Sequence, residues 1–225
     1  MRWLAVLDMD GTILEYRTID VLCEKLHLTE KLREIDEQSK FMNDYAVNLR
    51  VAKLFRGLKA SNMAEIFDTI KTVKGAREFV DFLKSRDFVT AIVTDSYTFL
   101  AARLASKLGV ETVKGNQLGI VDGTITGKIV APLGFKEGEN TRCPTKAICK
   151  LQVMNDLCRE YSIRDNQTLA VGDTQSDSLI VEKARIGVAF RPKDASLTKV
   201  ATVVVHTDFF DLLRLLKDFL DGLSH

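Results

Sequence analysis

The sequence predicts an α/β fold built on an open parallel sheet, and two observations lead to that prediction. Short apolar runs rich in β-branched residues are nearly continuous rather than alternating, as expected for strands buried on both faces. Helical patterns lie between them, which is typical of parallel strands joined by crossover helices. The candidate strands are residues 3–7, 88–93, 168–171, 186–190 and 202–205.

The connecting helices follow from apolar residues spaced three and four positions apart. This periodicity predicts helices over residues 76–85, 99–108 and 146–161, and the second of these ends before Gly109, a common helix stop. A closing amphipathic helix is expected over residues 208–220, with its apolar side on the core.

Two stretches interrupt this alternation. Residues 16–72 hold helical patterns and no strand-like run, so we expect a small helical domain inserted after the first strand. Asp122 and Gly123 lie between alternating apolar residues, which is a strong signal for a β-hairpin. The predicted division is a core of residues 1–14 and 73–225 and an inserted domain of residues 15–72.

The composition excludes several classes of protein. The chain has 225 residues, of which 46% are hydrophobic and 28% charged, so it can bury a core and is unlike a disordered chain. A formal net charge of +1 argues against a nucleic-acid or membrane-surface partner. Three histidines far apart in the sequence disfavour a histidine-ligated metal or a Ser-His-Asp triad. Carboxylates are therefore expected to carry the chemistry.

The cysteines and the apolar segments bear on the compartment. Cys23, Cys143, Cys149 and Cys158 show no C-x-x-C spacing and predict reduced thiols in a reducing compartment. The apolar run before Asp8 is shorter than the core of a secretory signal, and no later stretch approaches a membrane span. We therefore expect a cytoplasmic protein with no membrane association.

Acidic and hydroxyl side chains follow three of the candidate strands. Asp8 and Asp10 follow the first, Thr94-Asp95-Ser96 the second, and Asp173 and Asp177 the strand at 168–171. Because ligands bind outside the carboxyl ends of parallel strands, we expect these side chains to converge on one edge of the sheet. Each piece alone is more often a turn or a helix cap than part of a site.

Aspartates crowded together need a positive partner. Two carboxylates about 4 Å apart repel by about 4 kcal/mol at an effective dielectric of about 20. A calcium loop starting at Asp8 is excluded, because Ile13 and Ile19 stand where such a loop needs Gly and Glu. With oxygen ligands alone, Mg²⁺ shared with a phosphate group fits best.

Taken together, these motifs resemble those of the haloacid dehalogenase superfamily of phosphotransferases, and most closely its phosphoserine-phosphatase branch. They occur in the same order across nearly the whole chain. Supporting segments are Arg50-Val51-Ala52, residues 75–80, Thr98-Phe99 leading to residues 107–110, and residues 122–127. The resemblance implies a Rossmann-like core in which the helical insert forms a cap over the crevice.

The resemblance also implies a role for each site residue. Asp8 would be the nucleophile that forms an aspartyl-phosphate, and Asp10 the general acid and base. Thr94 would donate to a phosphoryl oxygen, and Lys146 would offset the charge of Asp8 and the phosphate. Mg²⁺ would be bound by the Asp8 carboxylate, the Asp10 main-chain carbonyl and Asp173, with Asp177 orienting a metal-bound water or Lys146. Lys136 and Lys150 remain alternatives to Lys146.

One departure from the branch bears on the leaving group. Arg17 stands nine residues after Asp8, where phosphoserine phosphatases have a Glu that holds the substrate ammonium. We hypothesise a leaving group with no amino group there, whose carboxylate or second phosphate is bound by Arg17 and Arg50. The alternative is that Arg17 is a solvated surface charge and that Glu15 holds an amine.

Two further departures lie near the phosphate. Asp95 and Ser96 replace a pair of glycines and are candidate substrate contacts, and Ser176 replaces an Asn in the last motif.

The predicted function is Mg²⁺-dependent hydrolysis of a small phosphorylated metabolite by a monomer or homodimer. A phosphotransferase or phosphomutase would use the same motifs. A phospho-receiver signalling module is the alternative from another class, and the insert over the crevice disfavours it. A degenerate binding protein is disfavoured because all four motifs of the family are retained, namely Asp8 with Asp10, Thr94, Lys146, and Asp173 with Asp177.

Overall fold

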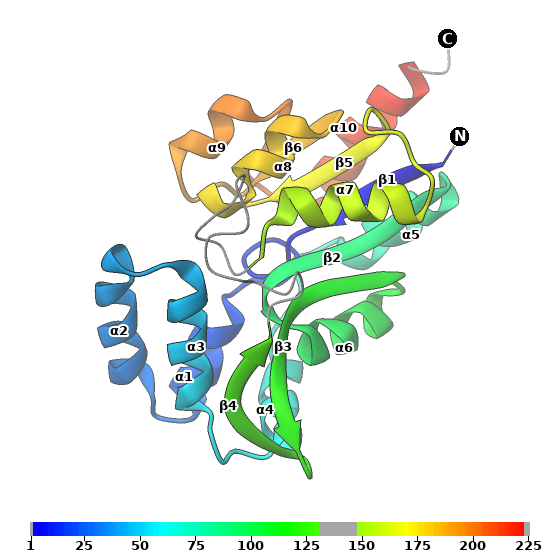
Figure 1. Ribbon diagram of the computed structural model, residues 1–225. Helices are drawn as coiled ribbons and strands as arrows, with labels where there is room; N and C mark the ends of the chain where they lie inside the picture. The colour runs from blue at the N-terminus through cyan, green and yellow to red at the C-terminus, as the bar shows by residue number, and fades with distance from the viewer. Residues whose placement is uncertain (1, 131–147, 223–225) are drawn as a thin grey trace.

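The computed structural model describes residues 2–130 and 148–222, and at its centre lies a seven-stranded sheet in the order β4-β3-β2-β1-β5-β6-β7 (Figure 1). Neighbouring strands are parallel except β3 and β4, which form an antiparallel hairpin at one edge. The strands are β1 (Trp3–Leu7), β2 (Phe88–Tyr97), β3 (Thr112–Val121), β4 (Thr124–Val130), β5 (Thr168–Gly172), β6 (Ile186–Phe190) and β7 (Val203–Val205). The α/β class and the Asp122-Gly123 hairpin are confirmed.

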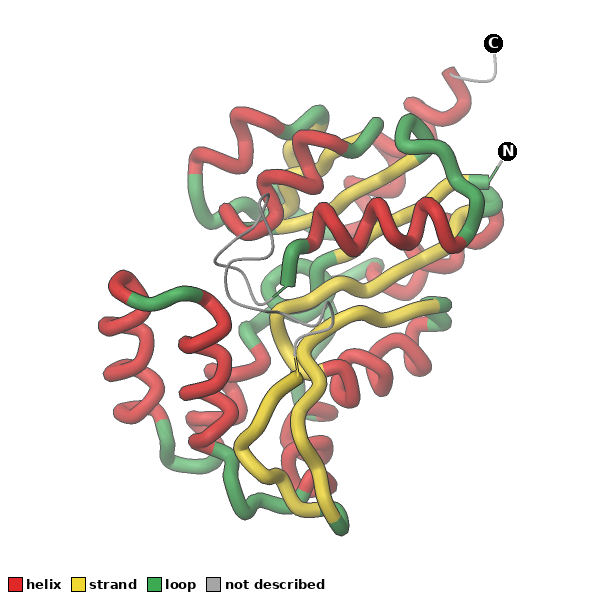
Figure 2. The backbone as a smooth tube through the Cα atoms, in the orientation of Figure 1, coloured by secondary structure: helices red, strands yellow, loops and turns green. Residues whose placement is uncertain are grey.

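Helices cover both faces of this sheet (Figure 2). One face carries α5 (Ala76–Ser85), α6 (Thr98–Leu108) and α10 (Phe209–Gly222), and the other carries α7 (Lys150–Glu160), α8 (Ser178–Lys183) and α9 (Ala195–Val200). In β1, Leu4 and Val6 pack in the cluster under α7 to α9, whereas Ala5 and Leu7 join the larger cluster on the opposite face. Burial on both faces explains why this strand is apolar without alternation.

Between β1 and α5 the chain forms a group of helices beside the sheet (Figure 1). They are α1 (Thr18–Lys25), α2 (Thr29–Gln38), α3 (Asp44–Leu54) and α4 (Ala60–Asp68), with a 3-10 turn at Ser39–Phe41. Asn43 starts α3 by accepting a hydrogen bond from the Ala46 N–H at 2.8 Å, as a capping residue does. This stretch is helical as predicted, while its boundaries as a separate domain stay a prediction.

Main-chain hydrogen bonds join the inserted helices to the rest of the described chain in two regions. Where the chain leaves and re-enters the core, the Glu15 N–H donates to Lys71 O at 2.9 Å and the Val73 N–H to Ile13 O at 2.8 Å. Further away, residues 57–60 pair with β4, through Gly57 N–H to Ile125 O (2.8 Å), Ile125 N–H to Leu58 O (2.9 Å) and Ala60 N–H to Gly123 O (2.9 Å). The edge hairpin therefore supports the inserted helices as well as the sheet.

Two element boundaries differ from the predictions. β2 continues to Tyr97, so Thr94, Asp95 and Ser96 lie inside the strand and not after it, at a shift in the pairing of β2 with β3 between Val93 and Tyr97. The apolar pattern ended at residue 93, but main-chain pairing does not require apolar side chains, and pairing with β3 resumes at Tyr97. The helix predicted from residue 146 begins at Lys150, and Lys146 itself lies outside the described residues.

The cysteine prediction is wrong in part. Cys149 is disulfide-bonded, whereas Cys23 and Cys158 carry free thiols. A disulfide needs only that two β-carbons approach closely in the fold, so the absence of a C-x-x-C motif was not a sufficient argument. In the described ranges, no helix has the length and apolar character that crossing a bilayer requires. A cytoplasmic location stays a prediction.

Candidate active site

The candidate site lies at the carboxyl ends of β1 and β5, where the strand order reverses. From β1 the chain adds β2 and β3 on one side of the sheet and later β5, β6 and β7 on the other. Asp8 follows β1 and donates its N–H to Val171 O in β5 at 2.9 Å, and Asp173 follows β5. Open parallel sheets bind ligands at such a reversal. The topology thus brings together aspartates that are far apart in the sequence.

A buried lysine joins two of these aspartates. Lys150 Nζ donates to Asp8 Oδ1 at 2.5 Å and to Asp177 Oδ1 at 2.7 Å. The side chains of Lys150, Asp8 and Asp177 are only 4%, 7% and 0% exposed, so water screens this contact little. The second oxygen of Asp177 accepts the main-chain N–H groups of Asp173 (3.2 Å) and Thr174 (3.3 Å). We call Asp8, Asp177 and Lys150 the buried charge cluster.

The local sequence explains how this cluster forms. A β-carbon at Gly172 would lie 2.3 Å from Asp177 Cβ, so only glycine lets the acidic turn fold back against the end of β5. Lys150 is the first residue of α7, which places its side chain beside the exits of β1 and β5. Residues 146 and 150 are one helical turn apart, so periodicity could not choose between them. The structure brings Lys150 to Asp8, whereas Lys146 lies outside the described residues.

Burial and charge shift the pKa values of the cluster. Burial raises the pKa of Asp8 well above its usual value, and the neighbouring Asp177 and Asp173 raise it further, while Lys150 lowers it. Burial lowers the pKa of Lys150, but Asp177 and Asp8 outweigh this effect and hold that pKa well above its usual value. Lys150 therefore remains an ammonium group and supplies the positive charge that an ionised Asp8 needs.

Asp10 is held by the start of the inserted helices. Its Oδ1 accepts the Thr18 N–H at 3.0 Å and also the Thr18 hydroxyl. Burial raises the pKa of Asp10 to about 6, although the two bonds from Thr18 lower it. A carboxyl group that titrates near neutral pH can both donate and accept a proton under ordinary conditions, which is what an acid and base catalyst requires.

Buried hydroxyl groups lie in the last part of β2 and in the loop after β1. Thr94 is 1% exposed, and its hydroxyl oxygen accepts the Ser96 N–H at 3.0 Å. The hydroxyls of Ser96 and Thr12 are buried and make no hydrogen bond with any residue that the structure describes. The Asp95 carbonyl accepts a bond from Asn116 Nδ2 at 2.7 Å. These hydroxyls are donors that a phosphoryl group could use.

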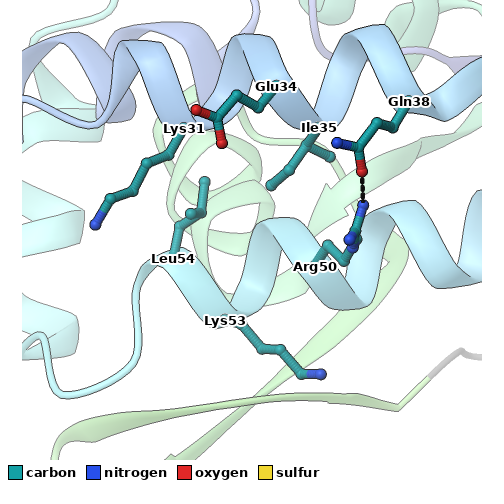
Figure 3. A pocket seen from close by; sticks show the side chains of 7 residues that line it. All are labelled: Lys31, Glu34, Ile35, Gln38, Arg50, Lys53 and Leu54. Atoms are coloured by element: carbon teal, nitrogen blue, oxygen red, sulfur yellow. Dashed lines mark hydrogen bonds between the residues drawn. The ribbon is translucent and has the colours of Figure 1, made fainter.

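The predicted substrate-binding arginines have partners within the protein. Arg17 donates through Nη1 to Asp20 at 3.1 Å and to Asp36 at 3.2 Å. Arg50 contacts Gln38 and lines a pocket between α2 and α3, on whose rim Lys31 and Lys53 also lie (Figure 3). In the described part of the chain Arg50 contacts Gln38 and Met42, and neither is an aspartate of the candidate site.

The alternative residue for an amine, Glu15, also has a partner. Glu15 Oε2 pairs with Arg191 Nη1 at 2.7 Å, and both side chains are about one-third exposed, at 30% and 34%. Arg191 follows β6, so this ion pair joins the exit of that strand to the start of the insert. A substrate amine at Glu15 would have to displace Arg191.

The aspartates fit a hard divalent cation. Oxygen atoms of Asp8, Asp173 and Asp177 lie within 4.8 Å of one another, and all three residues are buried. Asp177 already uses one oxygen for Lys150 and the other for main-chain N–H groups, which leaves Asp8 and Asp173 as the better direct ligands. A donor set made only of oxygen suits Mg²⁺ and not a softer metal.

Known proteins with similar sequences and structures identify the family. The sequence model of the family of haloacid dehalogenase-like hydrolases matches residues 5–179 of this chain. A phosphoserine phosphatase of Streptococcus thermophilus is 29% identical over 221 residues, which cover 97% of each protein. One of Idiomarina loihiensis is 31% identical over 216 residues, covering 95% of this chain and 91% of that protein.

The solved structures agree on the fold. A phosphoserine phosphatase with bound substrate matches with a TM-score of 0.79 at 23% identity, covering 96% of this chain and 98% of that one. A HAD family hydrolase from Salmonella enterica matches with a TM-score of 0.81 at 21% identity, covering 93% of this chain and 70% of that one. From the family match and these relatives, the chain belongs to the haloacid dehalogenase-like hydrolases and to the phosphoserine-phosphatase-like branch of phosphatases among them.

Proposed function

We propose that this protein is a Mg²⁺-dependent phosphomonoester hydrolase that acts on a small phosphorylated metabolite through a phosphoaspartyl intermediate on Asp8. The observation that carries the proposal is the buried charge cluster, in which Lys150 holds a nucleophilic carboxylate at the exit of β1. Lys150 takes the role that the sequence resemblance gives to Lys146. The similarity to phosphoserine phosphatases of Streptococcus thermophilus and Idiomarina loihiensis supports the reaction class.

The residues divide the reaction into two displacements. In the first, an Asp8 oxygen attacks phosphorus, the bond from phosphorus to the leaving oxygen breaks, and Asp10 gives its proton to that oxygen. In the second, water attacks the phosphoaspartate, Asp10 takes the proton of that water, and the bond from Asp8 to phosphorus breaks. Asp8 and Asp10 are thereby restored, and inorganic phosphate is released.

The other groups stabilise the charge on the transferring phosphoryl group. Lys150 balances Asp8, while the hydroxyls of Thr94 and Ser96 are donors for phosphoryl oxygens. A Mg²⁺ held by Asp8, the Asp10 carbonyl and Asp173 would supply further electrostatic stabilisation when bound. No single group suffices, because uncatalysed monoester hydrolysis needs acceleration by up to about 10²¹-fold.

We also propose that the preferred leaving group differs from serine. Arg17 brings a positive charge to the start of α1, where an ammonium group would be repelled. Its bonds to Asp20 and Asp36 are to exposed carboxylates, 55% and 43% accessible, and an anionic substrate group can exchange with such partners at little cost. A phosphorylated hydroxyacid fits this position better than phosphoserine does.

The first experiment measures phosphate release from an aryl phosphate with and without Mg²⁺. Wild-type turnover that needs Mg²⁺ and disappears in Asp8→Asn is expected. A long-lived phosphoaspartate without turnover would contradict hydrolysis and indicate a phospho-receiver. Phosphate transfer to an added alcohol in place of water would indicate a phosphotransferase.

A second experiment compares kcat/KM for phosphoserine and for phosphorylated hydroxyacids. The wild type is expected to favour the hydroxyacids, and Arg17→Glu to raise relative use of phosphoserine by about tenfold, as an interaction of about 1.4 kcal/mol would. Arg33→Glu, in an exposed pair with Glu30 on α2, is the matched control and should change nothing. A clear wild-type preference for phosphoserine would refute the proposed preference.

A further inference from the structure

A second lysine contacts the aspartates from the outer side of the site. Lys193 Nζ lies 2.7 Å from Asp173 Oδ2, and the side chain of Lys193 is 56% exposed while that of Asp173 is 1% exposed. The ammonium group therefore reaches inward from solvent to a buried carboxylate. None of the roles described above uses this lysine.

The main chain fixes this contact as well. The Lys193 N–H donates to Asp173 O at 2.9 Å, so the same two residues are joined twice. The next residue, Asp194, accepts the Gln175 N–H at 2.8 Å through Oδ2 and also caps α9. The loop after β6 is thus held against the acidic turn after β5. The main chain of Lys193 is therefore fixed in position relative to Asp173.

The loop after β1 is shaped to admit the same ion pair. Gly11 has a φ of +83°, and a β-carbon on it would lie 2.2 Å from Asp173 Oδ2 and 2.4 Å from Lys193 Nζ. Any other residue at this position would occupy the space of both partners. Three separate segments, at residues 11, 173 and 193, therefore meet at this contact.

We propose that Lys193 is a positioning residue that fixes the carboxylate of Asp173 so that it can bind a divalent cation. The proposal rests on the proposed function, because it concerns the same metal. An ion pair with one carboxylate oxygen holds the negative charge of Asp173 in place before the cation arrives. Partners of this kind commonly change metal affinity 10- to 100-fold when they are removed.

The charges of the site agree with this role. Five carboxylates (Asp8, Asp10, Asp95, Asp173 and Asp177) and three cations (Arg17, Lys150 and Lys193) act on one another here, which leaves a formal charge of −2 when all eight groups are ionised. One divalent cation would neutralise that charge. The two lysines are divided between the aspartates, since Lys150 contacts Asp8 and Asp177 while Lys193 contacts Asp173.

The test measures Mg²⁺ binding to the metal-stripped full-length protein by titration calorimetry, without substrate. Lys193→Met is expected to raise the Kd for Mg²⁺ about tenfold, and Lys193→Arg, which keeps the charge, to recover most of the affinity. Lys183→Met is the matched control, because Lys183 is 57% exposed and pairs with Glu182, whose side chain is 47% exposed. Circular dichroism and thermal melting check that each variant is folded.

The sign of the change separates the proposal from its rival. If Lys193 only occupied the position of the cation, its removal would relieve repulsion and lower the Kd for Mg²⁺, and that result would overturn the proposal. An unchanged Kd in Lys193→Met, or an equal rise in Lys183→Met, would overturn it too. A wild type that binds Mg²⁺, loses affinity in Lys193→Met and yet hydrolyses no phosphomonoester would refute the proposed function while leaving the role of Lys193 intact.

Discussion

The buried charge cluster and the ion pairs of the inserted helices use the same residue types with different consequences. In the cluster, Lys150, Asp8 and Asp177 are at most 7% exposed. In the insert, Arg17, Asp20 and Asp36 are 40%, 55% and 43% exposed. Removing one member of a buried pair leaves an uncompensated charge, whereas exposed pairs contribute little to stability. Substituting a residue proposed for the chemistry should therefore also destabilise the fold where it leaves a buried charge without a partner. Substituting a charge proposed for substrate choice should leave stability almost unchanged.

The largest expected effect comes from removing the nucleophile of the buried charge cluster while keeping the packing of its side chains. Asp8→Asn should reduce phosphate release from an aryl phosphate by at least about 10⁴-fold, because an amide cannot act as the nucleophile. Its amide oxygen can still accept the bond from Lys150, so the melting temperature should stay near that of the wild type. Residual turnover within tenfold of the wild type would show that Asp8 is not the nucleophile.

The next largest effect is a loss of stability when the buried charge cluster loses its lysine. Lys150→Met should lower the free energy of unfolding by about 3–5 kcal/mol, because Asp8 and Asp177 would remain buried together without a cation. Urea unfolding at neutral pH in EDTA measures it. Adding Asp177→Asn should restore part of the lost stability, and such non-additivity is expected only between residues in contact. Equal stability of Lys150→Met and Lys183→Met would contradict this account.

A smaller effect is the pH dependence of stability that comes from Asp10, which lies close to the buried charge cluster in sequence and accepts hydrogen bonds from Thr18 at the start of the inserted helices. Burial raises its pKa to about 6, so the folded protein holds this proton more tightly than the unfolded chain does. The stabilisation is present at low pH and is lost as the pH rises from about 4 to about 6, by on the order of 2 kcal/mol. Unfolding in EDTA at pH 4.5 and 6.5 measures it. In Asp10→Asn this part of the pH dependence should disappear, and a wild-type slope unchanged by the substitution would exclude Asp10 as its source.

The smallest expected effect is the loss of stability when an exposed ion pair of the inserted helices is removed. Arg17→Ala should lower the free energy of unfolding by less than about 1 kcal/mol, since both of its carboxylate partners remain solvated. Arg33→Ala in the same group of helices should behave alike. If Arg17→Ala cost as much stability as Lys150→Met, the division between structural and exchangeable charges would be wrong.

Sequence patterns predicted the parts of the molecule that local chemistry determines. Apolar runs located β1 and β6, and Asp122-Gly123 located the edge hairpin, because burial and turn geometry are recorded in neighbouring residues. The aspartates at 8 and 173 could be placed together because parallel strands share one edge. Their exact partners could not be predicted in this way.

What the sequence left open depends on contacts between distant segments. Periodicity could not choose Lys150 over Lys146, since both fall on one face of the predicted helix. Lys193 offered no signal, because its partner is 20 positions away, on the exit of another strand. The disulfide at Cys149 likewise depends on spatial approach and not on spacing.

The main-chain bonds between residues 57–60 and the β3–β4 hairpin have a consequence for how the inserted helices can move. Two chain crossings alone would allow the inserted helices to rotate as one body about a single axis. The extra main-chain bonds from Gly57 and Ala60 to the hairpin anchor the opposite border of the insert. Any movement of the inserted helices as one body must therefore either separate these bonds or bend the hairpin together with the helices, and amide exchange at Ile125 would report which of the two occurs.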